Sequence, residues 1–76
     1  MELQEFISNF ADQFEDTDAS EITKNTIFKD LDEWSSLLAL SVSAMAEEEY
    51  GVSFKGDDIR IASTVEDLYM ILKNKS

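Results

Sequence analysis

The first fourteen residues carry apolar side chains at helical spacing. One face of a helix would collect Leu3, Phe6, Ile7, Phe10 and Phe14, because each lies three or four residues from its neighbours on that face. This stripe predicts a helix over residues 2–14. Its aromatic members are expected in the core rather than around a ligand, since large apolar side chains usually pack inward.

A second helical pattern follows two adjacent serines and stops at a glycine. Three inward-facing residues share one line of this helix: Leu38, Val42 and Met45. Serine is a preferred first residue of a helix, and Gly51 suits the left-handed conformation that often follows a helix end. The sequence therefore predicts a helix that begins at Ser35 or Ser36 and ends at residue 50.

Two shorter patterns complete the chain. An extended segment and a single helical turn are predicted up to residue 61, with the turn near residues 57–61. The buried candidates of this region are Val52, Phe54, Ile59 and Ile61. A capping box is expected to open the last helix, made either by Ser63 with Glu66 or by Thr64 with Asp67. The inward stripe of this helix is Val65, Leu68, Tyr69 and Leu72.

Residues 15–34 form a long polar connection without a helical period. Five apolar residues are spread through it: Ile22, Ile27, Phe28, Leu31 and Trp34. These side chains are expected to fix the loop on the core, and a loop of this length in a small domain is usually functional or disordered. The expected fold is all-α, one domain over residues 1–76. It is a small bundle of three main helices plus one short helix, with a long loop between the first and second helices.

The charge of the chain narrows the class of partner. Seventeen acidic residues stand against six basic ones, which gives a formal net charge of −11. Such a chain is repelled by nucleic-acid phosphates and by anionic lipid surfaces, so we expect partners with basic protein surfaces and no nucleic acid. No apolar run approaches the roughly 20 residues of a membrane span. We therefore expect a cytoplasmic monomer that does not insert into membranes.

The chain contains no histidine and no cysteine. Their absence removes the commonest general base, the best side-chain nucleophile and most transition-metal ligands, so we do not expect an enzyme or a metal site. A calcium loop is not expected either. Asp16, Asp18 and Ser20 begin like an EF-hand, but Glu21 replaces the glycine at the sixth position and Ile27 replaces the glutamate at the twelfth.

Ser35 and Ser36 place two hydroxyl groups at a predicted helix N-terminus. Either serine could serve only as a cap of the helix. A phosphate ester on one of these hydroxyls would be favoured, because the unpaired N–H groups and the helix dipole attract an anion. No general base lies nearby in the sequence, so another protein would have to install such a group.

Four short motifs resemble, in their order and spacing, those of acyl carrier proteins and related peptidyl or aminoacyl carrier domains. The loop carries the pair Phe28 and Leu31. The second helix opens with Trp34, Ser35, Ser36 and Leu37 and ends with Glu47, Glu48, Glu49, Tyr50 and Gly51. The last helix is entered through Ser63, Thr64, Val65, Glu66, Asp67 and Leu68. Each motif is weak alone, but together they span essentially the whole chain.

The resemblance implies that Ser36 carries a covalent 4′-phosphopantetheine arm, whose thiol holds acyl groups as thioesters. Ser36 is favoured over Ser35 because the family's modified serine directly precedes a leucine, here Leu37. The implied partners are a phosphopantetheinyl transferase and acyl-transferring, condensing or ligase enzymes of fatty-acid, polyketide or related biosynthesis. The family usually has aspartate before this serine, so the presence of Ser35 there puts the transferase preference in question.

Partner docking is expected on Leu37 and Leu40, which lie one turn apart beside the serine, and on the acidic residues Glu47 and Glu48. A place for the two leucines in the core is an equal alternative. Three other interpretations of the chain stay open. It could be a specialised aminoacyl or D-alanyl carrier, a cofactor-free acidic helical adaptor, or a small hydrolase with Ser36 as nucleophile, which the missing base disfavours.

Overall fold

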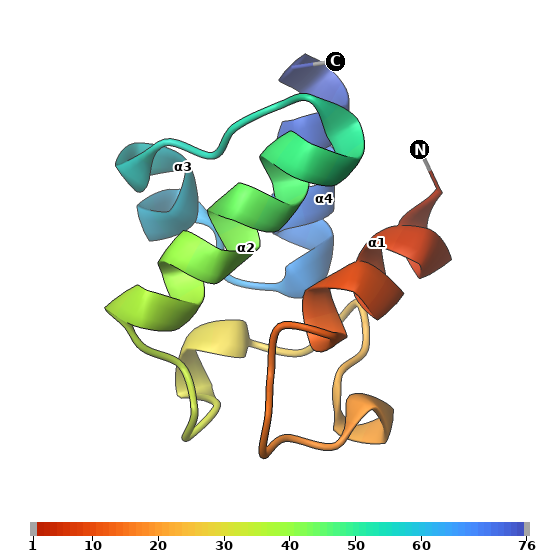
Figure 1. Ribbon diagram of the computed structural model, residues 1–76, viewed down its shortest axis with the longest axis vertical. Coiled ribbons are helices and arrows are strands. Elements are labelled where there is room, and N and C mark those ends of the chain that lie inside the picture. The colour runs from red at the N-terminus through yellow and green to blue at the C-terminus, as the bar shows by residue number, and fades with distance from the viewer. Residues whose placement is uncertain (1, 76) are drawn as a thin grey trace.

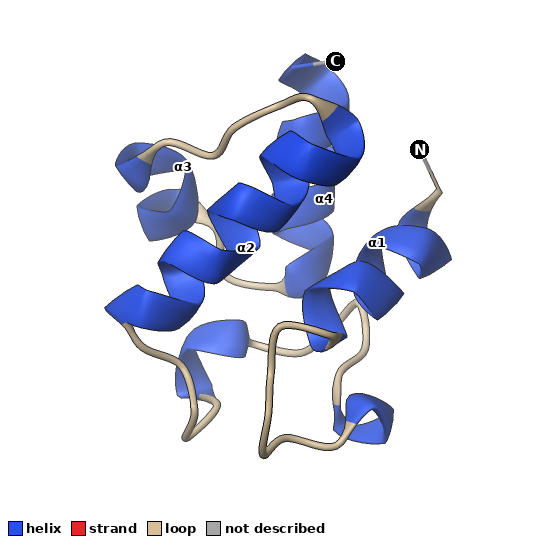
Figure 2. Ribbon diagram, in the orientation of Figure 1, coloured by secondary structure: helices blue, strands red, loops and turns tan. Residues whose placement is uncertain are grey.

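Residues 2–75, the part of the chain that the computed structural model describes, contain four α-helices and two short 3₁₀ turns joined by loops. The helices are α1 (Leu3–Ala11), α2 (Ser36–Tyr50), α3 (Gly56–Ile61) and α4 (Val65–Lys75), and the 3₁₀ turns are η1 (Ala19–Glu21) and η2 (Phe28–Asp30). α2 crosses in front of α4, with α1 and α3 on opposite sides of this pair (Figure 1). The predicted all-α bundle of three main helices, one short helix and a long first loop is confirmed (Figure 2). Within residues 2–75, no helix has both the length and the apolar character needed to cross a membrane.

α1 ends three residues earlier than the apolar stripe predicts. Its last helical residue is Ala11, and the chain then tightens into 3₁₀-type turns. The N–H of Gln13 donates to the carbonyl of Phe10 at 3.1 Å, and the N–H of Phe14 donates to the carbonyl of Ala11 at 3.0 Å. Phe14 is still buried. The stripe thus predicts the buried face correctly, although its last member lies outside the α-helix.

α2 has the bounds that its end signals predict. Ser35 is extended, with φ −158° and ψ 174°, and the helix begins at the next residue. Gly51 ends it in the left-handed conformation, with φ 70°, which costs glycine little because it has no Cβ. Val42 and Met45 are buried, as predicted, together with Ala46.

α3 differs from the predicted pattern of burial at its end. Ile61 was expected in the core, but 68% of its surface is exposed, and Ala62 is buried in its place. The reason is that the helix stops at Ile61 and the chain turns to an extended conformation at Ala62, with φ −74° and ψ 143°. The ammonium group of Lys75 pairs with the carboxylate of Asp58, which joins the end of α4 to α3 and lowers the pKa of Asp58.

α4 is capped by the second of the two predicted boxes. The N–H of Asp67 donates to the hydroxyl of Thr64 at 3.1 Å, and the Asp67 carboxylate accepts from the N–H groups of Thr64 and Ser63 at 3.0 and 2.9 Å. These backbone hydrogen bonds lower the pKa of Asp67. The box of Ser63 with Glu66 does not form the cap. The predicted inward stripe of α4 is buried as a whole: Val65, Leu68, Tyr69 and Leu72.

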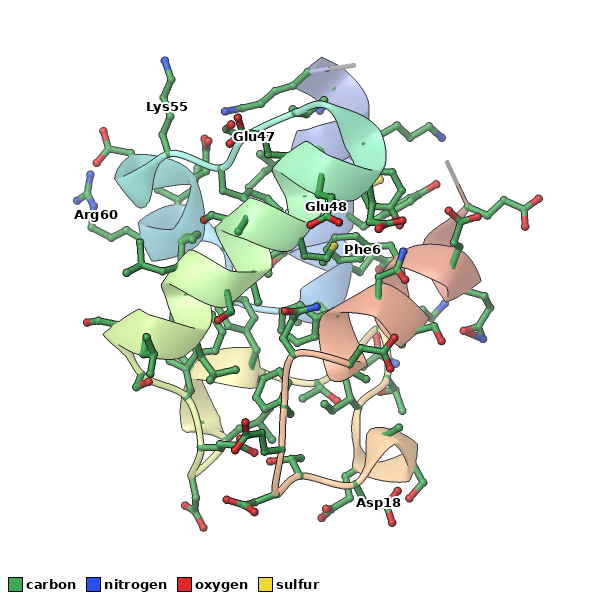
Figure 3. The ribbon with its side chains drawn as sticks, viewed as in Figure 1. Phe6, Asp18, Glu47, Glu48, Lys55 and Arg60 are labelled. Atoms are coloured by element: carbon green, nitrogen blue, oxygen red, sulfur yellow. The ribbon has the colours of Figure 1, made fainter. Side chains whose placement is uncertain are left out.

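Aromatic rings fill the centre of the bundle. Phe6 and Phe10, from the stripe of α1, are fully buried, and Phe6 lies between α1 and the crossing of α2 with α4 (Figure 3). The ring of Phe10 has its centroid 5.3 Å from Phe14, 6.0 Å from Phe28 and 6.4 Å from Trp34. Each such pair stabilises the fold by about 0.5–1.5 kcal/mol beyond the burial of its area.

The long first loop is held on the bundle by side chains and by its backbone. Ile22 and Phe28 are buried, as predicted. Ile27 was expected to be buried too, but 49% of its surface is exposed. Its backbone instead forms an isolated antiparallel bridge with Thr64, and the N–H of Val65 donates to the carbonyl of Thr26 at 3.1 Å. The loop therefore meets α4 through its backbone at this point, with the Ile27 side chain turned outward.

Candidate functional site

The hydroxyl of Ser35 caps the N-terminus of α2. Its Oγ accepts a hydrogen bond from the N–H of Leu38 at 3.3 Å, and its carbonyl accepts the first helical bond, from the N–H of Ala39 at 3.0 Å. Ser35 therefore has the position and the hydrogen bond of an N-cap residue. Aspartate and serine are both good N-caps, so either residue could fill this structural role.

Ser36 is the first residue of α2 and is exposed to solvent. Among residues 2–75, no hydrogen bond to its hydroxyl is found. The first turn of the helix contains no acidic side chain, so a phosphate ester on Ser36 would meet the positive end of the helix dipole without repulsion from that turn. The two serines thus differ in kind, since one hydroxyl caps the helix and the other is available.

Leu37 and Leu40 form an exposed apolar ridge directly after Ser36. Their exposed fractions are 70% and 68%, which excludes the alternative that they belong to the core. The ridge separates two open grooves. One, of about 420 Å³, runs toward α3 and is lined by Ser36, Leu40 and Phe54, among others.

The second groove lies on the other side of the ridge and has a volume of about 310 Å³. Leu37 and Ser35 line it from α2 and its cap, and Gln13, Glu15 and Glu33 line it from the loop. The groove beside Leu37 therefore has acidic residues that come from the first loop. Residues 36–46 of α2 contribute none, because they contain no charged side chain.

Glu47 and Glu48 lie at the opposite end of α2 from Ser36. Glu47 accepts a hydrogen bond from the hydroxyl of Ser53 at 3.1 Å, on the side of the connection to α3. Glu48 points from a different side of the helix (Figure 3). Glu48 lies eleven positions after Leu37, which is about 16 Å along the helix axis, and Glu47 lies seven positions after Leu40, which is about 10 Å. The two acids thus lie two turns or more from the apolar ridge.

Glu33 has a role that the sequence pattern does not reveal. Its Oε2 accepts from the N–H of Glu15 at 2.7 Å, and its Oε1 accepts from the N–H groups of Asp16 and Thr17 at 3.0 and 2.9 Å. The hydroxyl of Thr17 donates to the same Oε1 at 2.9 Å. The Glu15 N–H makes the largest contribution to lowering the pKa of Glu33, partial burial opposes it, and the other donors add to it. We call this arrangement the Glu33 clamp.

The acidic segment that resembles the start of a calcium loop is engaged in local capping. Asp18 accepts from the N–H of Ser20 at 3.0 Å, and Glu21 accepts from the N–H of Asp18 at 3.3 Å, so that both carboxylates cap η1. The hydrogen bonds from Ser20 lower the pKa of Asp18. Over residues 2–75, the acidic side chains form no group of three or more that could hold a metal ion.

The N-terminus of α2 therefore combines three features between Ser35 and Leu40. Ser36 presents a free hydroxyl, Ser35 caps the helix, and Leu37 and Leu40 expose an apolar ridge. The chain contains neither histidine nor cysteine. No family model matches the chain, and no curated protein or solved structure matches it either.

Proposed function

We propose that this protein is an acyl carrier protein that carries a 4′-phosphopantetheine arm on Ser36. The observation that supports the proposal best is that the two adjacent serine hydroxyls have different roles. Ser35 uses its hydroxyl to cap α2, and Ser36 leaves its hydroxyl exposed at the end of the helix that attracts a phosphate. The ordered motifs around Ser36 support the same assignment.

The protein has no catalytic activity of its own in this proposal. The chain has no histidine or cysteine that could activate the Ser36 hydroxyl, and in this proposal a phosphopantetheinyl transferase attaches the arm from coenzyme A. The arm supplies the thiol on which acyl groups are carried. The protein brings the tethered thioester to each partner enzyme, which raises the local concentration of substrate at the partner's active site.

Partner enzymes are proposed to dock on the ridge of Leu37 and Leu40 through an apolar socket with basic residues around it. The net charge of −11 favours partners with basic surfaces, because attraction between opposite charges speeds the encounter. Glu47 and Glu48 are proposed to assist in the encounter from the far end of α2. Reversing both charges should slow transfer to partner enzymes at low salt more than reversing one charge at Glu5 and another at Glu2. Equal rates for the two double variants would remove Glu47 and Glu48 from the docking surface.

The cargo is proposed to be an acyl intermediate of fatty-acid, polyketide or related biosynthesis. A carrier of aminoacyl or D-alanyl groups is the alternative closest to it. Some such carriers have a tryptophan two residues before the modified serine, where this chain has Trp34. Here the centroid of the Trp34 ring lies 4.8 Å from that of Phe28 and 6.4 Å from that of Phe14. Packing therefore accounts for Trp34 without reference to the cargo.

The test is a mass measurement on the intact protein. The purified chain is incubated with coenzyme A, magnesium and a broad-specificity phosphopantetheinyl transferase, beside the variants Ser36→Ala and Ser35→Ala. A mass gain of one phosphopantetheine group that is lost only in Ser36→Ala supports the proposal. The absence of any gain, with this transferase and with those of the source organism, would favour the cofactor-free adaptor.

A further inference from the structure

The four donors of the Glu33 clamp require an ionised carboxylate. A carboxylate has two oxygens that only accept hydrogen bonds, so it can satisfy three successive N–H groups and one hydroxyl at once. Glutamine has the same size, but its NH₂ group would face N–H donors instead of accepting from them. The N–H groups of residues 15–17 make no other backbone hydrogen bond in the described part of the chain. Glu33 is therefore what ties this part of the loop down.

Trp34 fastens the same segment from its apolar side. Its ring lies 6.4 Å from the rings of both Phe10 and Phe14 at the end of α1, and 4.8 Å from Phe28. Glu33 and Trp34 are consecutive residues. Together they fix this part of the chain to the backbone of residues 15–17 and to the aromatic rings around the end of α1. Only Ser35 then separates this segment from the first residue of α2.

We infer that Glu33 is a positioning residue for the modification of Ser36. This inference rests on the proposed function. The clamp holds residues 15–17 on the Glu33 carboxylate. Glu15 and Glu33 line the groove of about 310 Å³ together with Ser35 and Leu37, the two neighbours of Ser36, so these side chains form one preformed surface. A transferase that docks on this surface does not have to order it on binding, and ordering costs would otherwise weaken the complex.

The experiment compares Glu33→Gln with Glu5→Gln in the apo-protein. Both variants change the net charge by the same one unit. Glu5 is exposed on α1 and lines neither of the two grooves beside the ridge of Leu37 and Leu40. The readouts are kcat and KM of the transferase, with coenzyme A saturating, and amide hydrogen exchange at residues 15–17. If the attached loop falls to about one tenth of molecules in Glu33→Gln, KM rises about tenfold while kcat is unchanged.

A third variant, Thr17→Val, grades the effect. It removes one of the four donors and leaves the charge unchanged, so its KM should lie between those of the wild type and Glu33→Gln. Faster exchange at residues 15–17 in Glu33→Gln with KM equal to that of Glu5→Gln would show a purely structural clamp and overturn the positioning role. Unchanged exchange would overturn the clamp itself. A wild-type protein that no transferase modifies would instead refute the proposed function, and the positioning role with it, while exchange still reports on the clamp.

Discussion

Truncating each of the two serines in turn should separate stability from modification. Ser35→Ala removes the oxygen that accepts from the N–H of Leu38. Loss of an N-cap costs about 0.5–2 kcal/mol, and the 3.3 Å bond at an exposed position places Ser35 in the lower half, at about 0.5–1 kcal/mol. In a domain of this size, that cost lowers the Tm by roughly 2–8 °C.

Ser36→Ala should leave the stability unchanged and abolish the modification, the reverse of what is expected for Ser35→Ala. The Ser36 side chain is exposed, and no hydrogen bond to it is found among residues 2–75. Alanine is favoured over serine in a helix by about half a kcal/mol. The free energy of unfolding should therefore stay the same or rise slightly, while the mass gain from phosphopantetheine disappears.

The assays are thermal and urea denaturation followed by circular dichroism, together with intact mass after treatment with the transferase. Ser35→Ala should melt earlier and still be modified, and Ser36→Ala should melt normally and remain unmodified. A Ser36→Ala protein that loses more than about 1 kcal/mol would refute the view that its side chain makes no stabilising contact. A folded Ser35→Ala protein that is not modified would refute the assignment of the two roles.

Three further perturbations test other parts of the structure. Leu37→Ala and Leu40→Ala should each change the free energy of unfolding, measured in urea, by less than about 0.5 kcal/mol, because both side chains are exposed. A loss of about 2–5 kcal/mol would mean that these leucines are core residues. Gly51→Ala should lower the free energy of unfolding by about 1–2 kcal/mol, since the φ of Gly51 is 70°. Gly56→Ala should raise it by about 0.4–1 kcal/mol, because the new Cβ meets no atom within 4 Å. Urea midpoints of the two variants that move in the same direction would contradict this. The Glu33 clamp lowers the pKa of Glu33 from its ordinary value of 4.5, so its stabilisation is present above that value and is lost as the pH falls through the lower folded-state pKa. The Tm difference between the wild type and Glu33→Gln should shrink on acidification, and a difference that widens below pH 4.5 would be inconsistent with the clamp.

The ends of α2 could be predicted because their signals are local. An N-cap serine and a left-handed glycine act within one turn of the helix, and they occur at Ser35 and Gly51 as the sequence indicates. The cap of α4 was predicted only as one of two boxes. Ser63 with Glu66 and Thr64 with Asp67 have the same spacing, and the choice depends on where the chain leaves its extended path after Ala62.

Burial could be predicted only where one apolar face is clear. The stripe of α4 is buried as a whole. In the first stripe Phe6, Phe10 and Phe14 are buried, and Leu3 and Ile7 are partly buried. α2 carries apolar residues on several sides, so its pattern could not decide whether Leu37 and Leu40 face the core or solvent. Ile27 and Ile61 were misplaced for related reasons, because a backbone bridge to Thr64 and the end of α3 set their directions.

The sequence by itself determined the number of helices, both ends of α2 and the acidic charge, since these depend on neighbouring residues or on composition alone. Only the tertiary structure decided which apolar side chains stay exposed beside Ser36 and what Glu33 binds. The backbone N–H groups that Glu33 accepts from lie 16 to 18 residues away along the chain. A contact over that distance exists only after α1, the loop and Trp34 have packed together, so no local pattern of residues can specify it.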